Sequence, residues 1–268
     1  MDKNRFKEAA KGKEFISGIY NYCDRWCERC PQTSHCLNYS MGEEYFSDPE
    51  SRDIQNRVFW EKLTEVFRDT IALLEEKAAS EGIDLDTIDT AEFEREDLSV
   101  RNSAENHEIT KAAKVYIDMV ESWFDSTNII RKEHFEAGTG LLLNHTDGKG
   151  PEMSDSDDAI EVIRWYQHQI YIKLKRAISG LMEEEKETTG ELIQNAKDSD
   201  GSAKIALMGI DRSIAAWSIM GRLFPSFDSN DVQTILTHLE TLRRRFEQYF
   251  PDARAFIRPG FDIIDHNA

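Results

Sequence analysis

Proline and glycine are scarce in this chain, with 6 and 14 of the 268 residues. These are the residue types that most often interrupt helices, so their scarcity leaves long stretches in which a helix can continue. The alternation of apolar and polar residues that is typical of a half-buried strand never extends beyond a few positions. The sequence therefore predicts an all-α fold.

Long apolar runs are also missing. None approaches the roughly 20 residues that a transmembrane helix needs, and the charged residues 1–13 lack the apolar stretch of a secretory signal. We therefore expect a cytoplasmic protein without a membrane partner.

Positive charge is in deficit: 33 Lys and Arg face 51 Asp and Glu, which gives a net charge of −18. Nucleic-acid binding depends largely on neutralising phosphates, and anionic membrane surfaces attract basic segments. We expect no nucleic-acid partner, whereas a protein or a small molecule remains open.

Catalytic motifs are absent from the sequence as well. A carboxylate-bridged di-metal site in a helical bundle uses Glu-x-x-His, which does not occur here. There is no Gly-x-Ser-x-Gly elbow and no phosphate-binding loop. The sequence does not decide whether the protein is an enzyme.

What the chain does have is apolar residues at helical spacing. They predict an antiparallel bundle of about five long helices, over residues 49–79, 104–126, 157–187, 203–223 and 229–250. A further helix is expected over 14–29, with a loop and a short helical piece over 83–101.

Local signals refine two of these helices. Asp48 is expected to cap the helix that starts at Pro49, and Gly82 to follow its end. Along 203–223, small residues would let neighbouring helices approach closely; these are Ala206, Gly209, Ser213 and Ala216.

We expect one compact domain overall, made of a cysteine-containing unit over 1–47, the helical bundle over 48–250 and an extended tail over 251–268. Residues 138–157 contain four glycines and a proline. A connection of this length is usually a functional lid or disordered, and the composition favours disorder.

The four cysteines of the chain all lie within 14 residues, with the spacing Cys23-x3-Cys27-x2-Cys30-x5-Cys36. Metal ligands, disulfides and reduced core thiols are the competing explanations. Thiols stay reduced in the cytoplasm, where such clusters usually bind metal. We therefore predict a metal site with these four ligands.

The identity of the metal depends on how closely the four sulfurs can approach one another. On one unbroken helix, the Cα atoms of Cys23 and Cys30 would be about 10.5 Å apart, whereas two sulfurs on one zinc ion are about 3.8 Å apart. Pro31 relieves this difficulty, because it pushes Cys30 out of the helical region. We expect a structural Zn²⁺ ion, with a [4Fe-4S] cluster as the alternative.

The spacing of the last three cysteines resembles part of the cysteine pattern in the auxiliary-cluster domains of radical enzymes. The resemblance covers ten residues. The leading interpretation is a non-catalytic interaction or ligand-binding protein with a structural zinc site, and the alternative is an iron–sulfur redox protein.

Charged residues interrupt the apolar surfaces of the two helices predicted over 157–187 and 203–223. An interhelical salt bridge, for example between Asp211 and Arg164 or Arg176, would explain them. The alternative is a polar ligand pocket between these helices, lined by Glu161, Arg164, His168, Asp211 and Arg212.

Overall fold

The computed structural model describes residues 14–136, 151–186, 198–223 and 229–262. Within these ranges every regular element is a helix and none is a strand, which confirms the all-α prediction. None of the helices in these ranges combines the length and the apolar character that crossing a bilayer requires. The chain divides into two compact units: unit 1 contains residues 1–97 and 257–268, and unit 2 contains residues 98–256. The division at residues 47 and 250 stays a prediction.

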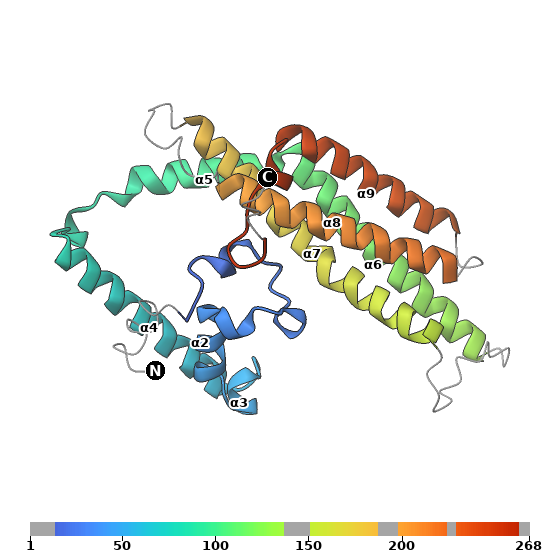
Figure 1. The fold of residues 1–268 in the computed structure, drawn as a ribbon, viewed down its shortest axis with the longest axis horizontal. Helices are drawn as coiled ribbons and strands as arrows, with labels where there is room; N and C mark the ends of the chain where they lie inside the picture. The colour runs from blue at the N-terminus through green and yellow to red at the C-terminus, as the bar shows by residue number, and fades with distance from the viewer. Residues whose placement is uncertain (1–13, 137–150, 187–197, 224–228, 263–268) are drawn as a thin grey trace, which may run out of the picture. The chain divides into compact units, whose positions relative to one another are not determined.

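Unit 2 contains four long helices that pack in a ring. In chain order they are α6 (Glu108–Glu136), α7 (Pro151–Lys186), α8 (Asp198–Leu223) and α9 (Ser229–Tyr249). Each packs against the next, and α9 packs back against α6. Consecutive helices run in opposite directions (Figure 1). The sequence predicted about five long helices in one bundle; the structure packs four of them together here and places the fifth, α4 (Arg57–Ser80), in unit 1.

The closest helix packing in unit 2 is between α7 and α8. The small residues predicted to permit it, Ala206, Gly209, Ser213 and Ala216, are all buried. A Cβ atom added at Gly209 would lie 2.9 Å from the Tyr166 ring. Trp217 of α8 is also fully buried, and its indole Nε1–H donates to the Tyr116 hydroxyl at 3.1 Å. The Trp123 ring meets the Trp217 ring edge-on, with centroids 5.0 Å apart.

Unit 1 is built from shorter pieces. They are η1 (Ile19–Tyr22), η2 (Cys27–Arg29), η3 (Thr33–His35), α2 (Leu37–Tyr45), α3 (Pro49–Arg52), α4 and η4 (Leu85–Thr87). α5 (Thr90–Asn106) begins in unit 1 and ends in unit 2. The predicted cap at Asp48 is confirmed by reciprocal side-chain bonds with Ser51. The predicted stop after α4 is also confirmed: Gly82 has φ +73°, and the Ile83 amide bonds the Ala78 carbonyl at 2.9 Å.

Two predicted helices are interrupted. The helix expected over 14–29 is wrong: the chain forms the short turns η1 and η2, with Cys23 extended between them. The helix expected over 49–79 breaks after Arg52. There the Asp53 carboxylate accepts the Gln55 amide at 2.9 Å, and the Asn56 side chain caps α4. Short polar side chains offer the backbone an alternative to the helical bonds, which is why the break falls at these residues.

The two irregular segments also differ from expectation. Of the connection expected over 138–157, residues 138–150 lie outside the described ranges, while 151–157 are helical and belong to α7. The tail is not an extended arm: Ala253–Ala255 form the 3₁₀ turn η5, and Phe256 is buried. Apolar residues draw this segment onto α8, where the Lys204 ammonium donates to the Phe256 carbonyl at 2.5 Å. Residues 257–262 belong to unit 1.

Candidate functional site

The four cysteines occupy the ends of successive tight turns. Cys23 follows η1 in an extended conformation, Cys27 begins η2, and Cys30 ends it. Cys36 ends η3 and is also the N-cap residue of α2. Cys23 and Cys27 therefore do not lie on the helix expected over 14–29, and the distance objection that followed from an unbroken helix no longer applies.

Local bonds explain why these residues turn. The Asp24 carboxylate accepts the Trp26 amide at 3.2 Å. Arg25 has φ +61°, in the left-handed region that a helix does not use. Further along, the Ile16 amide bonds the His35 carbonyl at 3.0 Å. These contacts bring the two ends of the cysteine segment together.

None of the four cysteines is in a disulfide, and all are partly buried. The Gln32 amide donates to the Cys30 sulfur at 3.4 Å, and the Cys23 thiol lies 3.5 Å from the Tyr20 carbonyl. Burial raises the pKa of Cys27, and the negative charges of the three other cysteines raise it further. The three other cysteines are thus near enough to Cys27 to act on it electrostatically.

In the conformation described, they do not form a closed coordination sphere. Among the described residues, no group of three or more His, Cys, Asp or Glu side chains is drawn together closely enough to hold a metal ion. The four cysteines lie at the ends of turns, and thiolates are donor types that suit a thiophilic metal. A metal at this position stays a prediction.

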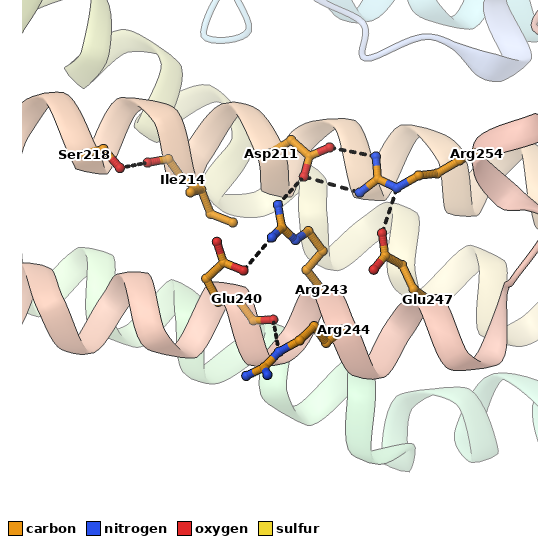
Figure 2. Close-up of polar contacts among 8 residues, drawn as sticks. All are labelled: Asp211, Ile214, Ser218, Glu240, Arg243, Arg244, Glu247 and Arg254. Atoms are coloured by element: carbon orange, nitrogen blue, oxygen red, sulfur yellow. Dashed lines mark hydrogen bonds and ion pairs between the residues drawn. The ribbon is translucent and has the colours of Figure 1, made fainter.

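The second predicted site is organised around Asp211. Its carboxylate forms ion pairs with Arg243 of α9 at 3.1 Å and with Arg254 of η5 at 2.8 Å (Figure 2). Arg243 also pairs with Glu240, and Arg254 with Glu247. Burial raises the pKa of Asp211, but the bonds from Arg254 and Arg243 outweigh it and lower the pKa overall. The ion pair that was predicted between Asp211 and Arg164 or Arg176 is replaced by pairs with Arg243 and Arg254.

The other residues of the predicted pocket have separate surroundings. Arg164 lies over the Phe124 ring, 4.0 Å from its centroid. Arg212 donates to the Tyr166 hydroxyl, while Glu161 and His168 are exposed on α7. Arg176, the alternative partner expected for Asp211, instead pairs with Asp198 at 3.0 Å. A shallow depression elsewhere is lined by Ser47, Pro49, Arg52 and Asp53, none of which is a predicted site residue.

The sequence analysis did not predict one polar cluster of unit 2, which is centred on Glu105. Glu105 accepts from Lys175 at 2.6 Å and from the Tyr171 hydroxyl at 2.7 Å, and it also pairs with Lys114. The bonds from Lys114, Lys175 and Tyr171 lower the pKa of Glu105 to about 2. Because the partners are up to 70 residues away along the chain, no local spacing indicates the cluster.

Comparisons with known proteins identify no relative. No family model matches the chain, and no curated protein or solved structure is significantly similar to it.

Proposed function

We propose that the N-terminal segment binds one Zn²⁺ ion through Cys23, Cys27, Cys30 and Cys36, and that this ion stabilises a non-catalytic interaction or ligand-binding protein. The observation that carries the proposal is the placement of four partly buried cysteines, none of them in a disulfide, on three consecutive turns. Scattered structural cysteines would not be placed in this way.

Electrostatics favour a cation among these sulfurs. Each thiolate raises the pKa of Cys27, so deprotonating all four without a counter-charge is unfavourable. A bound divalent metal reverses this balance, because it stabilises the thiolates that coordinate it. The Gln32 amide donates a hydrogen bond to the Cys30 sulfur. Such a bond also favours the thiolate form, because amide donors stabilise sulfur that carries negative charge.

A structural role is favoured by the small core of unit 1. Among its described residues, the buried apolar side chains are Ile19, Trp26, Tyr45 and Ala78. Units with little buried apolar surface usually need a metal, a disulfide or oligomerisation to be stable. The cysteines are not in disulfides, so a metal is the more direct source of stability.

The test is metal analysis of the full chain purified without oxygen, paired with a visible absorption spectrum. We expect one zinc per chain, lost in Cys27→Ser, and a drop in near-ultraviolet circular dichroism when a chelator is added. His35→Ala is the matched control: it alters a polar residue beside Cys36 and should keep the zinc. A brown protein with iron and acid-labile sulfide would replace zinc by the [4Fe-4S] alternative. If the purified protein contains no metal and a chelator does not change its stability, both the zinc proposal and the [4Fe-4S] alternative are refuted.

The remaining expectations follow from the same proposal. Free thiols are kept reduced in the cytoplasm, which is the location that we propose. The net charge of −18 favours a protein or small-molecule partner over a nucleic acid.

A further inference from the structure

The helix α4 exposes a stripe of large apolar side chains. Trp60, Phe67, Ile71 and Leu74 are 50%, 60%, 55% and 60% exposed. At about 100° per residue, these four positions fall within an arc of roughly 60° on one helix face. Single exposed apolar residues are common, but several large ones on one helix face are typical of an interaction surface.

Unit 1 uses a different face of α4 for its own packing. Asp69 accepts the Tyr45 hydroxyl at 2.7 Å, and the Phe59 ring lies 5.6 Å from the Phe46 ring. On the helix, Asp69 is about 180° from Trp60, and Phe59 is about 100° from it. The stripe is therefore a second apolar face that the contacts within unit 1 leave exposed.

One border of this stripe carries alternating charges. Arg57, Glu61, Arg68 and Glu75 follow it in the order plus, minus, plus, minus. Arg57 and Glu61 form an ion pair at 3.2 Å, but their side chains are 86% and 56% exposed. Such exposed pairs contribute little, so these side chains can pair with a new partner at small cost.

This order is self-complementary when the helix is reversed. In an antiparallel pair of identical helices, the same border of each copy meets. Arg57 then lies opposite Glu75 of the second copy, and Glu61 lies opposite Arg68, with both pairs level to within about 2 Å along the axis. The same register places Trp60 across from Ile71 of the second copy.

We propose that α4 is a self-association surface, which pairs antiparallel with α4 of a second copy of this chain. The helix has 24 residues and is about 36 Å long. One pair of helices of this length makes a small interface, and interfaces below about 1,200 Å² are typical of weak or transient complexes. We therefore expect a reversible, concentration-dependent dimer.

The test is sedimentation equilibrium of the full chain in a reducing agent that prevents disulfide-linked dimers. Arg57→Glu alone places two carboxylates opposite each other, and Glu75→Arg alone places two guanidinium groups together. Each variant should dimerise about tenfold more weakly than the unmodified chain. An equimolar mixture of the two should form a heterodimer at least as tight as the unmodified dimer, because both pairs then have opposite charges.

The mixture separates this geometry from the alternatives. In a parallel pair, residues 57 and 75 would be about 27 Å apart along the axis, so mixing would restore nothing. Ile71→Glu should abolish the dimer, whereas its matched control Ile172→Glu, at a 52% exposed isoleucine of α7, should leave it intact. A chain that stays monomeric at all concentrations, or a dimer indifferent to the charge changes, would overturn the proposal.

Discussion

The packing of α7 against α8 depends on the absence of a side chain at Gly209. In the substitution Gly209→Ala, the new Cβ atom would lie 2.9 Å from Tyr166 Cδ1 and 3.2 Å from Ile170 Cγ1. Neither neighbour can swing into solvent, since both side chains are 1% exposed. Tyr166 is held further by the bond from Arg212 to its hydroxyl.

Two opposing effects decide how Gly209→Ala changes the free energy of unfolding. Alanine is better than glycine in a helix interior by about 1 kcal/mol. Inserting a methyl group into a filled core costs roughly 1–3 kcal/mol. Because the new contact is closer than van der Waals distance and the ring cannot move away freely, we expect Gly209→Ala to lower the free energy of unfolding by about 1 kcal/mol on balance.

Urea denaturation followed by circular dichroism measures the change, and Gly42→Ala is the matched control. A Cβ at Gly42, in α2, meets no atom within 4 Å, so this variant receives the gain in helix propensity alone. The two substitutions are chemically identical and should have opposite signs. If Gly209→Ala stabilises the protein as much as Gly42→Ala does, the close approach of α7 and α8 described here is incorrect.

Three more outcomes follow from the core and its ion pairs. Tyr116→Phe removes the acceptor of the buried Trp217 indole and should destabilise unit 2 by about 1–3 kcal/mol in urea denaturation; an unchanged midpoint would show that the indole is satisfied otherwise. Asp211→Ala removes the carboxylate shared by two arginines, and because the site is partly exposed the expected loss is only about 1–2 kcal/mol. The pKa of Glu105 is lowered from 4.5 to about 2, so the stability that it contributes is present above pH 4.5 and is lost as the pH falls from about 4.5 to 2. In Glu105→Gln, the free energy of unfolding should depend less on pH between about 4.5 and 2. If its pH dependence there matches that of the unmodified chain, the lowered pKa of Glu105 is contradicted.

The long helices of unit 2 were predictable because their apolar residues repeat at helical spacing, and burial then selects that face. Ile109, Tyr116 and Val120 on α6 recur at helical spacing, and all three are fully buried. Capping is equally local: Asp48 and Gly82 act through bonds to residues within a few positions. Such signals are complete within a short window of sequence.

The cysteine segment was mispredicted as a helix because its spacing also fits a helix. The turns depend on a left-handed Arg25 and on the bond from Ile16 to His35, which joins residues 19 positions apart. Neither has a signature in composition or periodicity. Tertiary contacts override the local preference here.

Partner choice was beyond the sequence for a different reason. A charge on an apolar helix indicates an ion pair, and Asp211 does form one. Which arginine reaches it depends on how each helix is rotated about its axis and on where the chain continues after α9. Arg254 reaches Asp211 because η5 turns back onto α8.

The distribution of apolar residues between the two units connects both proposals. Among the described residues, unit 2 buries 30 apolar side chains and unit 1 buries four. Unit 1 does not lack apolar residues; α4 holds several of them at its surface. The exposed apolar face of α4 and the four clustered cysteines of unit 1 are the features on which the two proposals rest. A metal ion and a second copy would act on different parts of unit 1, so removing one should leave the effect of the other measurable.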